Sequence, residues 1–195
     1  EPLEGMRIYI PDPAQLKSTY EKLLTQNIQH PFPFWAKIWP AAIALGKFLI
    51  ENPSWIQNKQ VLEMGAGIGL PSFTIACKAK TVLVSDHSTE AVALLQKNIE
   101  FIDATNVTAA CIDWNAFPNN INADVILLSD INYAPDQFDS LLQLINQFLL
   151  NSTTIIISTP QRIMGNPFIN ALQPYIKESK VDTITSEQES TDISI

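Results

Sequence analysis

The stretch Val61-Leu-Glu-Met-Gly65-Ala-Gly67-Ile-Gly69 decides the fold class of this 195-residue chain. Its first four residues predict a short β-strand, because three of them are apolar, and the glycines that follow allow a tight turn. A helix is expected next, over Pro71–Lys80, since proline is tolerated in the first turn of a helix. This order brings the backbone amides of a helix N-terminus close to a polar or anionic ligand. The sequence therefore predicts a ligand site here, with a purely structural turn as the alternative.

The spacing of these glycines differs from that of two familiar nucleotide sites. In the dinucleotide fingerprint Gly-x-Gly-x-x-Gly, the third glycine would fall where this chain has Leu70. A Gly-Lys-Ser/Thr sequence is absent, which excludes a phosphate-binding loop for nucleoside triphosphates. The chain instead carries an acidic residue, Glu63, two positions before Gly65, and a dinucleotide site does not call for it. These features disfavour a nicotinamide-dependent dehydrogenase.

Strand and helix patterns alternate along the rest of the chain, which predicts a mostly parallel sheet covered on both faces. The expected strands are Val61–Met64, Thr81–Ser85, Val107–Ile112, Asp124–Ser129 and Thr153–Ser158, and the expected helices after Pro71–Lys80 are Thr89–Phe101, Asp136–Leu150 and Pro167–Lys177. A closing hairpin is predicted from Val181–Thr185 and Thr191–Ile195, joined by a polar turn. The predicted fold class is α/β: a Rossmann-like, doubly wound, seven-stranded sheet with a C-terminal antiparallel hairpin strand and an N-terminal helical segment.

Residues 1–40 differ from the remainder because six prolines interrupt them. Between these prolines, Ala14–Gln26 reads as one amphipathic helix. The aromatic-rich stretch Pro31–Pro40 cannot form a regular helix, since proline lacks the amide donor. A helix is expected over Ala41–Glu51, ended by Asn52 and Pro53. We therefore divide the chain into an N-terminal helical and aromatic cap segment, 1–40, and a main domain, 41–195.

Composition restricts the possible partners and location of the protein. Twelve Lys and Arg against 20 Asp and Glu give a formal net charge of -8, which disfavours a nucleic-acid partner because phosphates would be repelled. The longest apolar stretch is too short to span a bilayer, and the N-terminus lacks a signal pattern, so no membrane partner is expected. Cys77 and Cys111 sit in apolar runs and are predicted to be buried free thiols. We expect a soluble, cytoplasmic protein, acting as a monomer.

Two further polar positions follow predicted strands. Asp86, at the end of the second strand, could accept hydrogen bonds from both hydroxyls of a ribose. Its alternative role is capping the next helix, although Ser88 can do that. Asp113 and Trp114 follow the third strand and could bind the amine and the ring of an adenine. The alternative is an exposed aspartate beside a packing tryptophan.

Taken together, these motifs resemble the class I, seven-β-strand methyltransferases that use S-adenosylmethionine. The resemblance covers about residues 35 to 195. Two more segments resemble one branch of that class, the protein-lysine methyltransferases related to the calmodulin-lysine and electron-transfer-flavoprotein β-subunit enzymes. They are Phe34-Trp-Ala-Lys-Ile-Trp39-Pro-Ala-Ala and Ser129-Asp130-Ile-Asn-Tyr133, which carries an Asp-x-x-Tyr motif after the fourth strand.

The resemblance implies a role for each matched residue. Glu63 and the backbone of Gly65, Gly67 and Gly69 would hold the amino-acid end of the cofactor. The remaining cofactor-binding residues would be Asp86 for the ribose, Asp113 and Trp114 for the adenine, Trp39 closing over the molecule, and Ser129. Asp130 and Tyr133 would be the catalytic pair that faces the acceptor, a lysine presented by a protein substrate.

A lysine acceptor presents a chemical problem, because its amine has an ordinary pKa of about 10.4 and is protonated at neutral pH. A buried setting and a nearby sulfonium lower this pKa, whereas the Asp130 carboxylate would raise it. We therefore assign Asp130 to binding and orienting the amine, and not to acting as a strong base. The Tyr133 ring can pack against the lysine side chain or its cation.

Several alternatives remain open on the sequence alone. The acceptor could be a small molecule or RNA, or the chain could be a non-catalytic cofactor-binding domain of the same fold. His30 and His87 lie far apart and predict no metal site. Arg162, after the fifth strand, could reach an acidic group or be a solvated surface residue.

Overall fold

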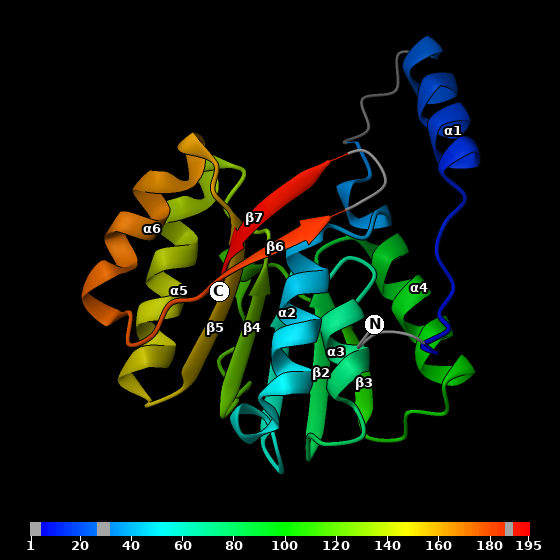
Figure 1. The fold of residues 1–195 in the computed structure, drawn as a ribbon. Helices are drawn as coiled ribbons and strands as arrows, with labels where there is room; N and C mark the ends of the chain where they lie inside the picture. Colours follow the sequence, from blue (N-terminus) through cyan, green and yellow to red (C-terminus); the bar gives the residue numbers. More distant parts are fainter. Residues whose placement is uncertain (1–4, 27–31, 186–188) are drawn as a thin grey trace.

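The computed structural model describes residues 5–26, 32–185 and 189–195, in which seven strands form one sheet (Figure 1). Their order is β3-β2-β1-β4-β5-β7-β6. The strands are β1 (Gln60–Met64), β2 (Thr81–Asp86), β3 (Val107–Cys111), β4 (Val125–Ser129), β5 (Thr154–Pro160), β6 (Val181–Thr185) and β7 (Ser190–Ser194). The first five are mutually parallel, and β7 runs antiparallel to both β5 and β6. The predicted fold class is confirmed.

The strand order changes direction at β1, which pairs with β2 on one side and β4 on the other. The chain thus winds outward from β1 in both directions, and the loops after β1 and β4 separate at this point. In open α/β sheets, ligands bind at such a switch point, outside the carboxyl ends of the strands. The topology therefore locates the binding edge.

Helices cover both faces of the sheet (Figure 1). One face carries α2 (Pro40–Glu51), α3 (Leu70–Ile75) and α4 (Thr89–Phe101), and the other carries α5 (Phe138–Leu150) and α6 (Asn166–Leu172). Strand β4 supplies both cores by alternation: Val125 and Leu127 pack on the first face, and Ile126 and Leu128 on the second. Burial on both faces explains why this strand is continuously apolar.

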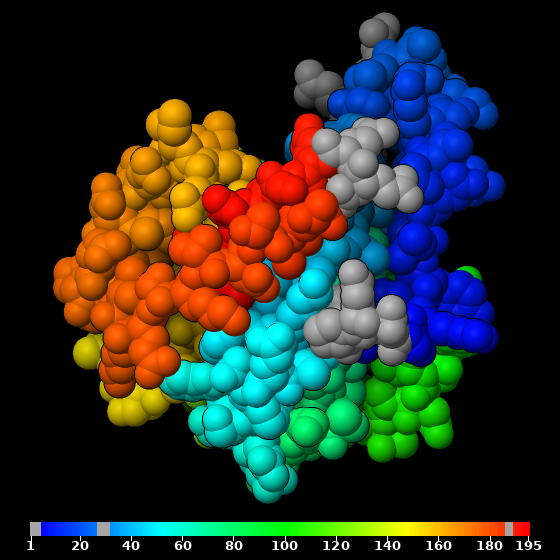
Figure 2. All heavy atoms as spheres, viewed as in Figure 1, coloured from blue at the N-terminus to red at the C-terminus, as the bar shows by residue number. Residues whose placement is uncertain are grey.

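The closing hairpin packs across α2. Ile184 of β6 and Ile193 of β7 are buried against Ala41 and Ala44 of that helix. Figure 2 shows the hairpin, in orange and red, lying over the cyan helix. The small alanine side chains let the hairpin approach α2 closely. The polar turn predicted between the two strands lies largely outside the described residues.

The N-terminal helix α1 (Pro13–Thr25) stands apart from the sheet (Figure 1). Asp12 caps it by accepting a hydrogen bond from the Ala14 amide at 2.8 Å, and none of its residues is buried. The stretch before it is fastened to α4, because the buried Asn98 side chain accepts from the Tyr9 amide at 2.6 Å and donates to the Tyr9 carbonyl at 3.1 Å. This stretch is thus anchored although α1 contributes nothing to the core.

Three helices are shorter than the sequence predicts. The helix expected to reach Lys80 ends at Ile75, where the Asn106 side-chain amide takes over as donor to the carbonyls of Ala76 and Ala79. Residues 135–137 form a separate 3-10 turn before α5. The helix expected over Pro167–Lys177 ends at Leu172 and continues as a 3-10 turn containing Pro174, which has no amide to donate. Further 3-10 turns cover Phe34–Ala36, Pro53–Trp55, Trp114–Ala116 and Ile163–Gly165.

The cysteine prediction was wrong in one respect. Cys77 and Cys111 are free thiols, as expected, but both are exposed. Cys77 follows the early end of α3, and Cys111 ends β3, which is an edge strand with a neighbour on one side only. Among the described residues, no helix is long and apolar enough to cross a membrane.

Candidate active site

A cavity of about 460 Å³ lies at the carboxyl ends of β1, β2 and β4. This volume falls in the range of small-molecule sites. Five parts of the chain contribute to its lining: the glycine loop after β1, the turn after β2, the loop after β3, the loop after β4, and the aromatic segment before α2. The predicted site residues among them are Trp39, Gly65, Gly67, Gly69, Asp86, Trp114, Ser129, Asp130 and Tyr133. The structure therefore brings nine of the predicted residues to one cavity.

The glycine loop needs glycine for two separate reasons. Gly65, Gly67 and Gly69 have φ values of 62°, 55° and 78°, a region that other residues rarely adopt. At Gly67 there is also no room for a side chain, because an added Cβ would lie 2.8 Å from the carbonyl oxygen of Trp35. The aromatic segment thus lies directly against the loop, and the two form one wall of the cavity.

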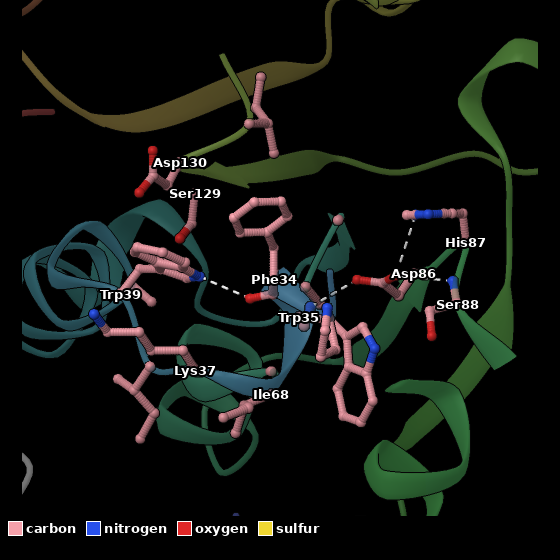
Figure 3. A pocket seen from close by; sticks show the side chains of 18 of the residues that line it. Phe34, Trp35, Lys37, Trp39, Ile68, Asp86, His87, Ser88, Ser129 and Asp130 are labelled. Carbon is pink, nitrogen blue, oxygen red and sulfur yellow. Dashed lines mark hydrogen bonds and ion pairs between the residues drawn. The ribbon is translucent and has the colours of Figure 1, made fainter. Parts of the chain in front are cut away.

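Asp86 joins this loop to the start of α4 (Figure 3). Its buried carboxylate accepts hydrogen bonds from the Gly67 amide at 2.8 Å and the Ser88 amide at 2.9 Å. The His87 imidazole lies 3.4 Å away. Ser88 caps α4 by accepting from the Ala91 amide. Asp86 is therefore not needed as the helix cap, and its fixed carboxylate borders the cavity with acceptor capacity left over.

Glu63 is the predicted cofactor residue that lies deepest. It is 1% exposed and is not among the residues that line the cavity. Its Oε2 accepts from both the amide and the hydroxyl of Ser72, whereas its Oε1 has no partner. Burial raises the pKa of the Glu63 carboxyl to about 7, and the hydrogen bonds from Ser72 offset only part of this effect.

The two residues predicted to frame adenine, Asp113 and Trp114, are adjacent in sequence, but only one of them lines the cavity. Trp114 lines the cavity, packs against Gly65, and donates its ring N–H to the Gln137 side chain at 3.2 Å. Asp113 is exposed, lies outside the cavity lining, and accepts a hydrogen bond from the Asn115 amide at 2.9 Å. Its role toward adenine stays a prediction.

The Asp-x-x-Tyr motif follows β4, and both of its named residues line the cavity. Asp130 is 6% exposed, has a left-handed φ of 54°, and is paired with Arg162. Tyr133 is 42% exposed. Its pKa is raised, first because part of the side chain is buried and then because of the negative charges of Asp86 and Asp130. A carboxylate and an aromatic ring therefore border the same space.

Aromatic rings close the cavity on the side of the N-terminal segment. The Phe34 ring lies 5.8 Å from the Tyr133 ring and 6.4 Å from the Trp39 ring. Trp39 donates its ring N–H to the Phe34 carbonyl at 2.9 Å (Figure 3). The Lys37 ammonium sits over the Trp39 ring, 4.7 Å from its centre. Such rings offer their faces to cations and to apolar side chains.

Sequence reasoning missed charged or titratable lining residues such as Lys37 and His87, and it left open the role of Arg162, which lies outside the lining. Lys37 and His87 line the cavity, and Arg162 contacts Asp130. Their position in the sequence could have indicated that they line the site, because Lys37 lies inside the quoted aromatic motif and His87 follows Asp86 directly. Among the described residues no group of three or more His, Cys, Asp or Glu could hold a metal ion, and His30 lies outside them.

Comparison with solved structures shows the fold. The N-methyltransferase NodS from Bradyrhizobium japonicum, in complex with S-adenosylhomocysteine, matches with a TM-score of 0.62 at 14% identity, over 90% of this chain and 96% of that one. The human methyltransferase 10 domain containing protein matches with a TM-score of 0.60 at 11% identity, over 94% and 96%.

Curated relatives are similar in sequence. The mouse electron transfer flavoprotein beta subunit lysine methyltransferase is 33% identical over 142 residues, which cover 67% of this chain and 51% of the relative. The human protein-lysine N-methyltransferase EEF2KMT is 30% identical over 122 residues, 53% of this chain and 37% of the relative. The chain spans about half the length or less of these relatives. A family model described as lysine methyltransferase matches residues 20–175, and the chain belongs to this family.

Proposed function

We propose that this protein transfers a methyl group from S-adenosylmethionine to a lysine side chain of a protein substrate. One observation carries the proposal: a single cavity joins the glycine loop and Asp86 to Asp130 and Tyr133. A nucleoside-type site and an acceptor-type site are thereby next to each other. The names of the relatives, which are lysine methyltransferases, support the same reaction.

The residues of the cavity fit the cofactor. Asp86 offers carboxylate lone pairs to ribose hydroxyls, the Trp114 ring offers a face to adenine, and the glycine loop presents backbone without side chains. Glu63 Oε1 is the one buried side-chain polar atom without a hydrogen bond in the described part of the chain, and we assign it to the amino-acid end. When bound, the cofactor supplies a methyl group already activated by a sulfonium.

The acceptor end must hold an amine in line with this methyl group. Methyl transfer of this kind depends mostly on proximity and orientation. We assign orientation of the amine to the Asp130 carboxylate and packing of the lysine stem to Tyr133, Phe34 and Trp39. These rings form an apolar, electron-rich wall that suits a long aliphatic chain with a cationic end.

Four broader expectations belong to the same proposal. Residues 1–40 would act as a cap on the main domain, 41–195, because Phe34 and Trp39 of this segment line the cavity. A cytoplasmic location is supported by two free, exposed thiols, which persist in a reducing compartment. The net charge of -8 supports a protein partner over a nucleic acid, and we propose that the chain acts as a monomer.

Incubation with tritiated S-adenosylmethionine and a cell lysate tests the proposal, with mass spectrometry to identify the labelled residue. Asp130→Asn keeps the side-chain shape and suits the left-handed backbone, so it removes charge without forcing a refolding. We expect it to slow methylation by about a hundredfold while S-adenosylhomocysteine affinity, measured by calorimetry, stays unchanged. Asp103→Asn, at an exposed aspartate that also has a left-handed φ, of 53°, is the matched control and should retain activity.

Other outcomes would point elsewhere. Label on RNA or on a small molecule would replace the lysine acceptor. Cofactor binding without any labelled product would favour a non-catalytic binding domain. Tight binding of a nicotinamide dinucleotide, together with no binding of S-adenosylhomocysteine, would overturn the cofactor assignment.

A further inference from the structure

We propose that Arg162 is a positioning residue for methyl transfer, which holds the Asp130 carboxylate in a fixed orientation and compensates its charge, so that the acceptor amine can react in its neutral form. This inference rests on the proposed function. Arg162 is not itself among the residues that line the cavity, and it would act through Asp130.

The geometry of the pair is bidentate. The guanidinium Nη1 bonds Asp130 Oδ1, and Nη2 donates to Oδ2 at 3.1 Å. The Asp130 side chain is 5% exposed, and that of Arg162 is 34% exposed. Two parallel bonds between a planar guanidinium and a carboxylate restrict rotation of the carboxylate, which a single ammonium could not do.

Three more contacts join the loop after β4 to β5 and to the loop that follows β5. The Asn132 side-chain oxygen accepts a hydrogen bond from the Thr159 hydroxyl at 2.6 Å. Gly165 packs so closely on the Asn132 side chain that an added Cβ would collide with its amide. The Asp130 amide also donates to the Ser158 carbonyl of β5 at 2.9 Å. Arg162 is therefore carried by a loop already fixed to the motif, and the pair is built before any acceptor arrives.

Charge is the second part of the inference. An uncompensated Asp130 carboxylate would stabilise an ammonium and thus raise the pKa of the acceptor amine. A methyl acceptor needs the opposite: the amine must give its proton to water before its lone pair forms the new nitrogen–carbon bond. The sulfur–carbon bond of the donor breaks in the same step, and its electron pair stays on sulfur. A guanidinium on Asp130 removes most of the attraction for the ammonium while keeping the carboxylate as an oriented acceptor.

The other charged or titratable groups around the cavity lie on different elements. Lys37 sits over Trp39, His87 faces Asp86, and Glu90 lies in the first turn of α4. Glu63 is buried outside the cavity lining, and the negative charges of Asp86 and Asp130 both act on Tyr133. Within the described residues, Arg162 is the cation in contact with Asp130. Its removal should therefore change the charge felt at the acceptor position more than removal of any distant cation.

A pH profile separates this role from a merely structural one. We would measure single-turnover methylation of the protein acceptor identified by tritium labelling, from neutral to alkaline pH. In Arg162→Gln we expect at least about a tenfold slower reaction at neutral pH. The midpoint of the profile should move upward by about one pH unit, because the amine stays protonated longer. The Michaelis constant should not rise, because the Asp130 carboxylate without its Arg162 partner attracts the substrate ammonium more strongly.

Three companion variants sharpen this test. Arg162→Lys keeps the positive charge and loses the bidentate hydrogen bonding. It should therefore keep the midpoint of the parent protein but not its full rate. Asp130→Asn combined with Arg162→Gln removes both charges and should return the midpoint toward that of the parent protein. Lys180→Gln removes an exposed ion pair with Glu51, in which Asp130 takes no part. This control should change neither the midpoint nor the rate. An unshifted midpoint in Arg162→Gln would overturn the proposal, even if the rate fell.

A second readout needs no acceptor. Because Asp130 contributes to the raised pKa of Tyr133, loss of the Arg162 charge should raise that pKa further. Tyrosinate absorbance, taken as the difference between each variant and its Tyr133→Phe counterpart, measures this value. We expect an upward shift in Arg162→Gln and its reversal in the double variant. No shift would overturn the role of Arg162, whereas a clear shift without any labelled acceptor would overturn the proposed function instead.

Discussion

Glu63 and Asp86 are two carboxyl residues on adjacent strands, and the fold treats them differently. Asp86 borders the cavity, and its carboxylate accepts hydrogen bonds from two backbone amides, those of Gly67 and Ser88. Glu63 is buried at 1% exposure, and one of its carboxyl oxygens, Oε1, has no hydrogen-bond partner. A desolvated carboxyl group such as that of Glu63 is favoured in its neutral form, and its pKa is raised to about 7. The two residues should therefore respond to mutation in different ways.

Asp86→Ala should weaken the binding of S-adenosylhomocysteine by about 1.5–3 kcal/mol, the range for hydrogen bonds to a charged group. The substitution removes the acceptor that we propose for the ribose hydroxyls and also leaves the Gly67 amide without this partner. Isothermal titration calorimetry measures the affinity, and circular dichroism checks the fold. Asp113→Ala in the same assay tests the adenine role predicted from the sequence. An unchanged affinity in Asp86→Ala would leave Asp86 with a structural role only.

Glu63→Gln should change how stability depends on pH. The folded-state pKa of about 7 lies above the ordinary value of 4.5, so the folded protein holds this proton longer than the unfolded chain does. Stability is therefore lost as the pH rises from the unfolded to the folded value, by on the order of 3 kcal/mol. Gln cannot ionise, so the variant should escape this loss.

Thermal unfolding of both proteins at about pH 4 and about pH 8 measures the effect as a difference in melting temperature. The advantage of Glu63→Gln over the parent protein should grow with pH. Glu100→Gln, at an exposed carboxyl of α4, is the control and should show no such growth. A constant difference across this range would contradict the burial argument.

At the scale of elements, the cavity depends on contact between the glycine loop and the 3-10 turn Phe34–Ala36. These two elements are about thirty residues apart in sequence, and Gly67 touches the backbone of Trp35. Because both surfaces are backbone, neither can move aside as a flexible side chain would. The fit between them fixes the position of the aromatic wall relative to the loop.

Gly67→Ala should separate these two elements. The new Cβ would meet the Trp35 carbonyl oxygen at 2.8 Å, and alanine is also strained at a φ of 55°. We expect S-adenosylhomocysteine affinity to fall by more than about tenfold, in keeping with the 1–3 kcal/mol cost of such strain. Calorimetry provides the measurement. Gly5→Ala shares the positive φ but meets no atom within 4 Å, so it should bind normally; equal losses in both variants would exclude the close contact as the cause.

At the scale of the whole molecule, the chain is acidic and carries a site that is proposed to receive an amine. The chain carries a net charge of -8, and the exposed Asp136 and Asp139 follow the Asp-x-x-Tyr motif directly. Opposite charges accelerate the encounter of two proteins and have little effect once they are bound. The acceptor segment should therefore be basic or neutral around its lysine.

Salt should consequently reduce kcat/KM and leave kcat nearly unchanged. Steady-state methylation of the labelled acceptor at increasing sodium chloride concentration measures both quantities. Asp136→Asn combined with Asp139→Asn should lower kcat/KM at low salt and flatten its salt dependence, because the local field is weaker. An acidic target segment, with activity that rises with salt, would contradict this expectation.

The amino-acid sequence by itself determined the elements and the motifs. Alternating apolar strands and amphipathic helices predicted the α/β sheet, and Thr89–Phe101 was predicted to the residue. Positive φ at Gly65, Gly67 and Gly69 agrees with the turn expected from their spacing. These features are local, since periodicity, capping and glycine conformation depend on a few neighbouring residues. Helix ends were less predictable, because groups distant in sequence bond the backbone there. The Asn106 side-chain amide, for example, donates to the carbonyls of Ala76 and Ala79 after α3.

Only the tertiary structure decided which side chains meet. It paired Asp130 with Arg162, 32 positions later, pressed Trp35 against Gly67, and left Asp113 outside the cavity. It also exposed both cysteines. Such contacts depend on the order of the strands and on how loops from β1, β2, β4 and β5 converge at one edge of the sheet. Residue spacing places these loops at the ends of strands, but the order of the strands, with both faces of the sheet buried, decides which loops meet.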